Sequence, residues 1–280
     1  MGVFKMEKEY FKNRFKDKTM IVTGGATGIG KAVSLRAANE SAEVVIVDKL
    51  EKEGNEVLNS IIDNGGKAMF INLDLTNEDN CQYLIDETVK TFHKIDIAVN
   101  NLGIMGNPNH LHQLPKKDMD YVMLTNFYTV FFCCKYEIQQ FMKQNTGGVI
   151  VNTSSISGVI GVPGNPAYSA SKHAINGLTK NIALDYAKYN IRINSVNPAT
   201  TATPLVEEAM EYVKSKIAEA KANGIDLLKA HSGSFLKTKN MLERDLTAEE
   251  QAASILYLAS DDATHMTGTT LQTDGGWTSF

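Results

Sequence analysis

The sequence predicts a single α/β domain, in which helices cover both faces of an open parallel sheet of about seven strands. Short β-branched runs alternate with longer stretches of helical periodicity along the whole chain. The runs are apolar at nearly every position, which is typical of strands buried on both faces of a parallel sheet. Because no repeat or low-complexity linker divides the chain, we expect one domain over residues 19–280, after an N-terminal extension at residues 1–18.

The strands and helices can be assigned in chain order. The expected strands are residues 19–23, 44–47, 68–71, 95–99, 149–151, 191–196 and, more weakly, 269–273. The stretches between them place apolar residues three and four positions apart, as a helix requires. One example is Leu84, Ile85, Val89 and Phe92. Thr247 with Glu250 predicts a capping box at the start of the last helix, and the alternation as a whole predicts right-handed crossovers.

One segment breaks this alternation. Residues 204–246 separate the sixth expected strand from the last helix, and a connection of 43 residues is far longer than usual. Its first half has an apolar helical stripe, and its second half, around residues 231–234, is polar. The stripe consists of Val206, Met210, Val213 and Ile217. Because the segment leaves a strand at the edge where such sheets bind ligands, we expect a substrate-binding lid. A rigid insertion that contacts another subunit is the alternative.

The composition excludes several classes of protein. Hydrophobic residues make up 43% and charged residues 21% of the chain, which is typical of a globular protein. The formal net charge of −4 and the lack of a long basic block argue against nucleic acid as a partner. No apolar run reaches the ~18 residues that a membrane-spanning helix needs. Three cysteines are too few for a disulfide scaffold, so we expect a cytoplasmic protein.

A glycine-rich turn follows the first expected strand and precedes a helical stretch. Residues 23–30 read Thr-Gly-Gly-Ala-Thr-Gly-Ile-Gly. Glycines at this place let the backbone turn tightly and approach a pyrophosphate, which then sits at the N-terminus of the helix. A purely structural turn is the alternative for the glycines alone.

An acidic residue at the end of the second strand strengthens the cofactor hypothesis. Asp48 stands 18 residues after Gly30, where a carboxylate can accept hydrogen bonds from ribose hydroxyls. The same carboxylate would repel a 2′-phosphate, and Thr27 supplies no cation to attract one. The positive charge of Lys49, next to Asp48, is a weaker signal in favour of NADP. We therefore expect NAD as the cofactor, in preference to NADP.

A tyrosine and a lysine share one face of a later helical stretch. Tyr168 and Lys172 are four positions apart, so the phenol and the ammonium can enter one pocket. A fixed cation favours the phenolate, so we expect Lys172 to lower the pKa of Tyr168. A phenol tuned in this way can exchange a proton with an alcohol oxygen. Ser155, just beyond the fifth strand, offers a second hydroxyl to the same oxygen.

These motifs together carry a family resemblance. They are residues 23–30, Asp74-Leu75, Asn100-Asn101-Leu102-Gly103, Asn126, Ser154-Ser155, residues 168–172, and Asn197-Pro198 with Thr203. In this order, over residues 18–276, the chain resembles the short-chain dehydrogenase/reductase family. The resemblance implies a Rossmann-type doubly wound sheet with helices on both faces.

The resemblance also implies a role for each matching residue. Tyr168 would be the general acid/base, and Lys172 would tune it while binding the nicotinamide ribose. Ser155 would hold the substrate oxygen, and Asn126 would support a water relay from Lys172 to solvent. The other cofactor contacts would be Gly24, Thr27, Gly28, Ile29, Gly30 and Asp48, then Asp74 and Leu75 at the adenine, Asn101 near the adenosine ribose, and Thr201 and Thr203 at the nicotinamide amide and phosphate.

Two positions depart from the family's pattern. Leu102 replaces the alanine of Asn-Asn-Ala-Gly, and Ala199 replaces the glycine that usually follows Pro198. Neither change removes a reacting group. The added bulk is expected to narrow the cofactor or substrate cavity beside Asn101 and Thr201.

The expected activity is therefore that of an NAD-dependent oxidoreductase, which interconverts a secondary alcohol and a ketone by hydride transfer. An NADPH-dependent carbonyl or 3-oxoacyl reductase is one alternative, and a non-catalytic NAD-sensing protein is another. The expected partner is a small-molecule alcohol or ketone, and the resemblance implies a homotetramer. No metal is expected, because His110 and His112 lack a third ligand at a characteristic spacing.

Overall fold

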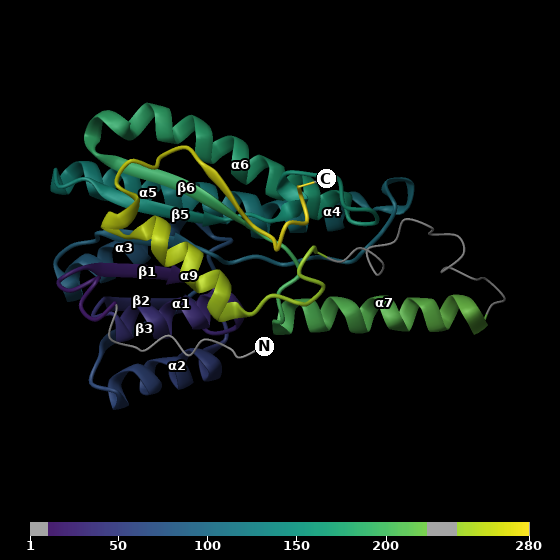
Figure 1. Cartoon of the computed structure of the whole chain (residues 1–280), viewed down its shortest axis with the longest axis horizontal. Coiled ribbons are helices and arrows are strands. Elements are labelled where there is room, and N and C mark those ends of the chain that lie inside the picture. Colours follow the sequence, from purple (N-terminus) through teal and green to yellow (C-terminus); the bar gives the residue numbers. More distant parts are fainter. Residues whose placement is uncertain (1–10, 223–239, 280) are drawn as a thin grey trace.

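Seven parallel strands form one sheet in the computed structural model, which describes residues 11–222 and 240–279 (Figure 1). The strands are β1 (Thr19–Thr23), β2 (Glu43–Asp48), β3 (Lys67–Asn72), β4 (Ile97–Asn100), β5 (Gly148–Thr153), β6 (Ile191–Pro198) and β7 (Thr270–Thr273). Their spatial order is β3-β2-β1-β4-β5-β6-β7, and every neighbouring pair is parallel. This arrangement confirms the predicted doubly wound α/β fold.

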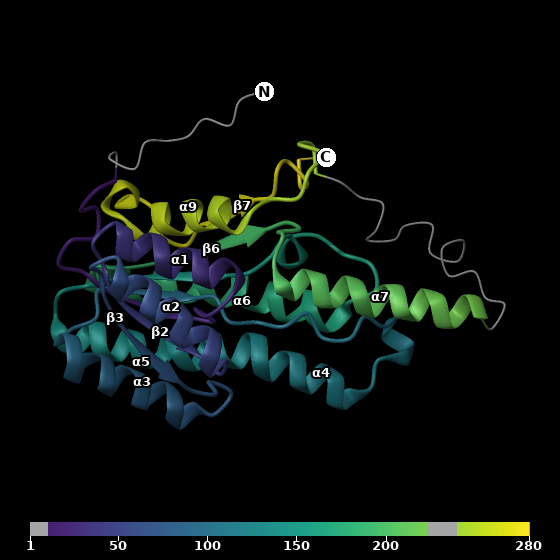
Figure 2. The ribbon, with the colours of Figure 1, turned by 90° about the horizontal axis from the view of Figure 1, so that it is seen from below.

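Helices cover both faces of the sheet (Figure 2). They are α1 (Gly28–Asn39), α2 (Glu51–Asp63), α3 (Glu78–Phe92), α4 (Lys116–Met123), α5 (Thr129–Gln144), α6 (Pro166–Tyr186), α7 (Pro204–Ala222) and α9 (Ala248–Ala259). Apolar side chains of α1, α2 and α9 pack on one face, and those of α3, α5 and α6 pack on the other. A π-helical turn, η2 (Leu124–Tyr128), joins α4 to α5, and short 3₁₀ turns include η3 (Ile156–Gly158) and η5 (Asp261–Ala263).

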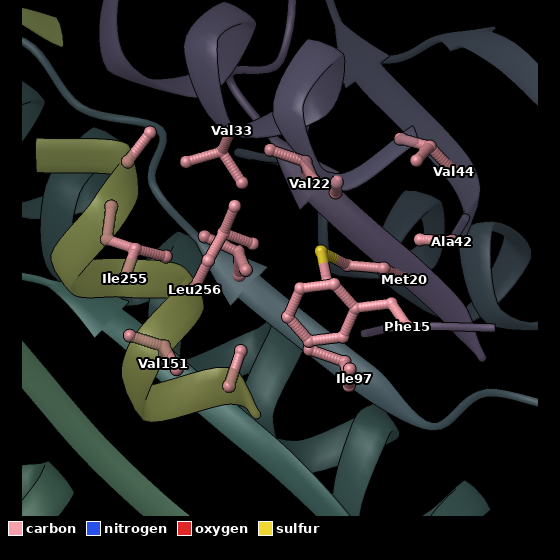
Figure 3. Packing of buried hydrophobic residues seen from close by; sticks show 14 of the residues in the cluster. Phe15, Met20, Val22, Val33, Ala42, Val44, Ile97, Val151, Ile255 and Leu256 are labelled. Carbon is pink, nitrogen blue, oxygen red and sulfur yellow. The ribbon is translucent and has the colours of Figure 1, made fainter. Parts of the chain in front are cut away.

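The first core lies between the sheet and helices α1 and α9, and it reaches into the expected N-terminal extension. Phe15 is 1% exposed and packs with Met20 of β1 and Ile97 of β4 in this core (Figure 3). Its backbone N–H donates to the carbonyl of Glu40 at 2.9 Å. The described part of the extension, residues 11–18, therefore packs against the domain. Burial of an aromatic ring of this size contributes a few kcal/mol, about 2–3 by area.

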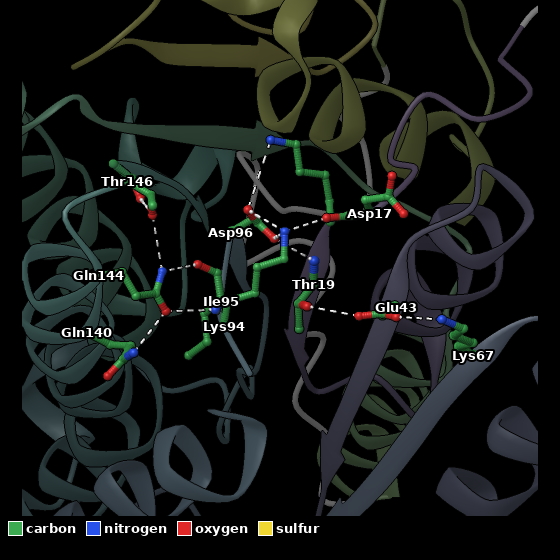
Figure 4. A network of polar contacts seen from close by, with 12 residues as sticks. Asp17, Thr19, Glu43, Lys67, Lys94, Ile95, Asp96, Gln140, Gln144 and Thr146 are labelled. Atoms are coloured by element: carbon green, nitrogen blue, oxygen red, sulfur yellow. Dashed lines mark hydrogen bonds and ion pairs between the residues drawn. The ribbon is translucent and has the colours of Figure 1, made fainter. Parts of the chain in front are cut away.

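A polar network ties together the N-terminal ends of the central strands (Figure 4). Asp96, just before β4, accepts a hydrogen bond from the backbone N–H of Thr19 at 2.8 Å. Its carboxylate also forms an ion pair with the ammonium of Lys94 at 3.0 Å. On its other side, Gln144 bonds both backbone groups of Ile95. This edge of the sheet is thus occupied by structural contacts, whereas the sequence motifs all lie at the opposite, C-terminal edge.

The long connection after β6 begins as a helix, as predicted. In both views α7 projects from the C-terminal edge of the sheet (Figures 1 and 2). Val206 and Met210 of its expected stripe are partly buried, while the side chains of Val213 and Ile217 and the polar residues 231–234 lie outside the described residues. The capping box of Thr247 and Glu250 is present at the start of α9. Within residues 11–222 and 240–279, each helix is too short or too polar to cross a membrane.

Candidate active site

The glycine-rich turn lies where the sheet reverses its winding direction. From β1 the chain winds through β2 to β3, then returns past β1 to β4. Ligands of doubly wound sheets bind at this switch point, beyond the C-terminal ends of the strands. The two loops that meet there are joined through one side chain. The hydroxyl of Thr23 accepts hydrogen bonds from the N–H groups of Asn101 at 3.0 Å and Leu102 at 3.3 Å.

Close backbone packing explains why glycines occupy this turn. Gly24 has a φ of +63°, in the left-handed region that favours glycine. A Cβ on Gly30 would lie 1.9 Å from the carbonyl oxygen of Gly24, so no larger residue fits. Asn101 holds the same carbonyl through its side-chain amide, at 3.3 Å. Helix α1 then begins at Gly28, and the side chain of its N-cap Thr27 makes no capping bond, so the first N–H groups can bind a phosphate.

Asp48 is held beside the glycine turn by backbone donors. One carboxylate oxygen accepts from the N–H of Ala26 and the other from the N–H of Leu50, both at 3.2 Å. The side chain is 6% exposed at the C-terminal end of β2. A carboxylate has lone pairs beyond those two bonds, so Asp48 can still accept hydrogen bonds from a ribose.

The expected adenine contacts lie beyond β3. Asp74 is exposed, and hydrogen bonds from the side chain and the backbone N–H of Thr76 lower the pKa of its carboxyl, with a smaller contribution from the charge of Lys49. Leu75 is 1% exposed, with its side chain in the core against α3, so only its backbone can meet a ligand.

The two expected threonine contacts follow β6. Thr201 is 3% exposed, and its hydroxyl donates to the carbonyl of Ala199 at 2.9 Å. Thr203 lies against the glycine turn, because a Cβ on Gly28 would come within 3.3 Å of its methyl carbon. Thr203 is therefore close to the start of α1, where a phosphate would bind.

Helix α6 carries the tyrosine and the lysine, and its start is sharply defined. Pro166 opens the helix, and Asn165 caps it by accepting a hydrogen bond from the N–H of Tyr168 at 3.3 Å. The amide of Asn165 also donates to the carbonyl of Met105 at 2.8 Å, which joins the helix to the loop after β4. The Nζ atom of Lys172 lies 5.5 Å from the centre of the Tyr168 ring, so the two side chains share one pocket, as the spacing predicts.

The hydroxyls of Tyr168 and Ser155 are brought together. Burial raises the pKa of the Tyr168 phenol above its ordinary value of 10.0, and a hydrogen bond with the Ser155 side chain acts in the opposite direction. The predicted lowering of this pKa is therefore wrong for the structure. The physical reason is that burial disfavours the phenolate more than the hydrogen bond with Ser155 favours it. Burial also lowers the pKa of Lys172 to about 8, so this lysine loses its positive charge more readily than an exposed one.

Lys172 and Asn126 flank one glycine. Lys172 is 3% exposed, and its ammonium donates to the carbonyl of Thr153 at 2.9 Å. A Cβ on Gly103 would lie 3.3 Å from Oδ1 of Asn126 and 3.4 Å from Nζ of Lys172. The lack of a side chain at Gly103 therefore leaves room for both polar groups beside the backbone. Asn126 sits in the π-helical turn η2 and bonds both backbone groups of Ile104, at 2.8 and 2.9 Å. Turns of this type are frequent at functional sites.

Comparison with known proteins agrees with this geometry. The family model described as enoyl-(acyl carrier protein) reductase matches residues 24–278. The chain is also 42% identical to a 3β-hydroxysteroid dehydrogenase of Mediterraneibacter gnavus, over 97% of this chain and 98% of that protein. The chain belongs to the short-chain dehydrogenase/reductase family. This is a family of oxidoreductases, and the motif-based resemblance is thereby confirmed.

Two further members extend the comparison. A cyclohexanol dehydrogenase of Acinetobacter is 34% identical, over 98% of this chain and 100% of that protein. The structure of an NAD⁺-bound xylitol dehydrogenase superposes with a TM-score of 0.80 and 29% identity, covering 94% of this chain and 99% of that one. The similarity to these two proteins covers at least 94% of this chain.

The two departures from the short-chain dehydrogenase/reductase pattern are accommodated by packing. Leu102 lies partly buried against the core on the α3 side, with its Cα close to Gly24. The methyl group of Ala199 belongs to a small apolar cluster with Ile156 and Leu246. The extra carbon of Ala199 is thus covered by neighbouring side chains.

Sequence reasoning missed a buried polar network behind the candidate catalytic residues. Glu137 of α5 is fully buried, and its Oε2 accepts from the amide of Asn100 at 3.0 Å. The same amide donates to Asn152 of β5 at 3.1 Å, and Asn152 donates to Thr179 of α6 at 3.0 Å. Burial raises the pKa of Glu137 to about 8. In the sequence, Glu137 could have been noticed as a charged residue on the apolar face of a helix.

Sequence reasoning also missed Asn165, although an Asn-Pro pair before a helix is a recognised start signal. Among the residues that the structure describes, no group of three or more His, Cys, Asp and Glu side chains is placed to hold a metal ion. The rings of His110 and His112 stack, with centroids 5.9 Å apart.

Proposed function

We propose that the protein is an NAD-dependent dehydrogenase that interconverts a cyclic secondary alcohol and the corresponding ketone. The observation that carries this proposal is that the buried ammonium of Lys172 lies 5.5 Å from the centre of the Tyr168 ring, with the buried Ser155 side chain close enough to lower the pKa of the phenol. The names of the relatives, a 3β-hydroxysteroid dehydrogenase and a cyclohexanol dehydrogenase, support a ring alcohol as the substrate class.

Tyr168 moves the proton in this proposal. Its raised pKa keeps the phenol protonated at neutral pH, which suits a general acid that donates to the oxygen of a ketone. In alcohol oxidation the phenol first passes its own proton toward solvent, the phenolate then takes the proton of the alcohol, and the Ser155 hydroxyl stabilises the phenolate by donating to it. Ser155 can instead donate to the substrate oxygen and so orient it toward Tyr168. A nicotinamide cofactor, when bound, supplies or accepts the hydride.

Lys172 and Asn126 serve the proton transfer from the other side of Tyr168. Since Thr153 accepts only one of the ammonium's three N–H bonds, Lys172 has donors left for a ribose hydroxyl and for water. The side-chain amide of Asn126 is fixed against the loop by its two hydrogen bonds to the backbone of Ile104. We propose that this pair bounds a water relay from Lys172 to solvent.

The residues of the glycine turn fit a dinucleotide. The lack of space at Gly30 and the uncapped first turn of α1 make a cradle that backbone N–H groups line, which suits a pyrophosphate. Gly24, Thr27, Gly28, Ile29, Asn101 and Thr203 would complete this part of the site, with Asp74, Leu75 and Thr201 at its two ends. The adjacent Asp48 would bind the adenosine ribose.

The charge at Asp48 favours NAD over NADP. The carboxylate is fixed between two backbone N–H groups, so it cannot turn away from a 2′-phosphate without losing both bonds. Lys49 is exposed, and its charge acts on Asp74.

The segment at residues 204–246 is proposed as the lid over the substrate. It leaves β6 at the edge where the catalytic groups lie, and the partly buried Val206 and Met210 offer apolar contacts. Closure of such a segment would exclude water from the reacting carbon.

An exposed aromatic face supports the proposed homotetramer. Four rings on η2 and α5 contact one another in a row, with centroids 5.6–5.9 Å apart. They are Phe127, Tyr128, Phe132 and Phe131. Tyr128 is 45% and Phe131 39% exposed, and a contiguous apolar surface of this kind is typical of a subunit contact.

Substitution of the phenol tests the proposed function. Tyr168→Phe keeps the ring and removes the proton, so alcohol turnover should fall by about 10²–10⁴-fold while NADH still binds. Tyr189→Phe removes the phenol of a tyrosine that is 41% exposed and serves as the matched control. We would measure kcat for a cyclic secondary alcohol and NADH binding by fluorescence. Turnover within a few-fold of the wild-type rate in Tyr168→Phe would refute the assignment.

A further inference from the structure

The single tryptophan of the chain packs beside the candidate active site. Trp277 contacts a small cluster formed by Ile156, Ala199 and Leu246, which is separate from the two cores that cover the sheet. These three residues are 4%, 7% and 5% exposed. They come from the turn after β5, the end of β6 and the segment before α9, so the cluster on which Trp277 packs joins three parts of the chain that are distant in sequence.

Ile156 links this cluster to the catalytic serine. It is the first residue of η3, and Ser155 is the N-cap of that turn, accepting a hydrogen bond from the N–H of Ser157 at 3.1 Å. The end of the turn is held by α6, where Asn176 donates to the carbonyl of Gly158 at 2.9 Å. Polar contacts thus fix η3 at its end, and the Trp277 cluster packs against its beginning, next to the serine.

Leu246 links the cluster to the base of the proposed lid. Its N–H donates to the carbonyl of Thr200 at 3.1 Å, and its carbonyl accepts from the N–H of Ala202 at 2.9 Å. These two bonds form a parallel bridge that brackets Thr201. The two ends of the segment at residues 204–246 are therefore held together directly beside the cluster.

The tail that carries Trp277 is itself well fixed. Asp274 accepts hydrogen bonds from the N–H groups of Gly276 at 3.0 Å and Thr278 at 2.9 Å, which closes a tight turn around the tryptophan. The carbonyl of Gly275 accepts from the N–H of Met241 at 2.9 Å. Both views place this tail, in yellow, beside the yellow-green segment that leads into α9 (Figures 1 and 2).

We propose that Trp277 is a positioning residue that clasps the Ser155 turn and the base of the segment at residues 204–246 into one unit. Its indole ring can cover more of this cluster than a smaller side chain could. Ala199, where the family pattern has glycine, supplies a methyl group to the same cluster. The inference rests on the proposed function, because the group that it positions is the serine that orients the substrate oxygen.

The first experiment compares Trp277→Ala with Trp277→Phe. Trp277→Ala should lower kcat/KM for the alcohol by about 10- to 100-fold, since a displacement of about 1 Å has effects of this size. The NADH dissociation constant should stay within about twofold, and Trp277→Phe should restore most of the activity. Leu242→Ala is the matched control, because Leu242 lies in the neighbouring segment but is 56% exposed. Unchanged kcat/KM in Trp277→Ala, or an equal loss of NADH affinity, would overturn the clasp.

A double-mutant cycle with Ser155→Ala separates positioning from a general loss of structure. If Trp277 acts through Ser155, then Trp277→Ala should cost little further activity in the Ser155→Ala background. Additive losses in kcat would overturn the proposal.

Fluorescence tests the cluster without any turnover. Emission excited beyond the tyrosine band comes from Trp277 alone, and Leu246→Ala should shift it to longer wavelengths by admitting water to the ring. Unchanged emission in Leu246→Ala would contradict the clasp even in an active enzyme. A wild-type enzyme that oxidises no secondary alcohol would contradict the proposed function instead, and the emission would still decide whether the clasp forms.

Discussion

At the scale of single residues, the contacts of Asp48 decide how cofactor choice is best tested. Removing the whole side chain would leave the N–H of Ala26 without its acceptor in a buried place, which costs stability in its own right. Asp48→Asn keeps an acceptor oxygen and removes the charge. We expect this variant to lose about tenfold in kcat/KM with NAD, as a charge-assisted hydrogen bond becomes a neutral one, and to gain with NADP.

Measurement of kcat/KM with both cofactors, in the wild type and in Asp48→Asn, tests this prediction. Lys49→Ala is the control, because the NAD preference should survive it. A wild-type preference for NADP, or loss of activity with NADP in Lys49→Ala, would mean that Lys49 governs the choice.

The identities of the site residues could be predicted from the sequence, whereas the pKa shift of Tyr168 could not. The i, i+4 spacing of Tyr168 and Lys172 and the position of Ser155 after a strand suffice to bring the three together. Whether the pKa of Tyr168 is raised or lowered depends on how deeply the phenol is buried, which only the folded chain determines. The acceptor for Lys172 is a backbone carbonyl, that of Thr153, and a sequence pattern does not mark such a group.

At the scale of elements, the buried carboxyl of Glu137 couples α5 to the ends of β4 and β5. Its folded pKa of about 8 lies above its ordinary value of 4.5, so the folded state holds the proton more tightly than the unfolded state does. The stabilisation from this group is complete below pH 4.5 and is lost as the pH rises toward about 8. The free energy of unfolding should therefore fall by several kcal/mol across this range because of Glu137.

Glu137→Gln should remove this pH dependence, since an amide of the same shape cannot ionise. The measurement is denaturant unfolding at several pH values between 4.5 and 8 for the wild type and the variant. Glu78→Gln on α3 is the control, because a hydrogen bond with Lys135 lowers the pKa of its half-buried carboxyl below the ordinary value. Equal pH slopes in Glu137→Gln and the wild type would show that this carboxyl does not titrate in the range.

The elements themselves follow from the sequence because the strands are buried on both faces. Each expected strand agrees with the observed one to within two residues at either end, since apolar runs end where the chain leaves the core. The π-helical turn η2 was not predicted. Its geometry depends on Asn126 bonding the loop at Ile104, which is a tertiary contact.

At the scale of the whole molecule, the aromatic row on η2 and α5 predicts self-association. Phe131→Glu places a charge on this row, and such a charge cannot be buried against a second copy without a large penalty. We expect the wild-type chain to sediment as a tetramer and Phe131→Glu to sediment as a smaller species. Ile62→Glu is the control, because Ile62 is 49% exposed on α2, which packs on the opposite face of the sheet. A wild-type monomer, or equal effects of both substitutions, would contradict the proposed interface.

At this scale too, the site of Tyr168 and Ser155, its place at the C-terminal edge of the sheet and the family of the chain support one reaction. That reaction is the proposed interconversion of a cyclic secondary alcohol and a ketone. The most direct measurement is the initial rate at which NAD is reduced in the presence of a ring alcohol, such as a 3β-hydroxysteroid or cyclohexanol, with NADP in a parallel series. We predict that the wild-type protein reduces NAD with at least one such alcohol, faster than it reduces NADP, and that Tyr168→Phe does not. Reduction of neither cofactor by any cyclic secondary alcohol, or equal rates in Tyr168→Phe and the wild type, would contradict the account.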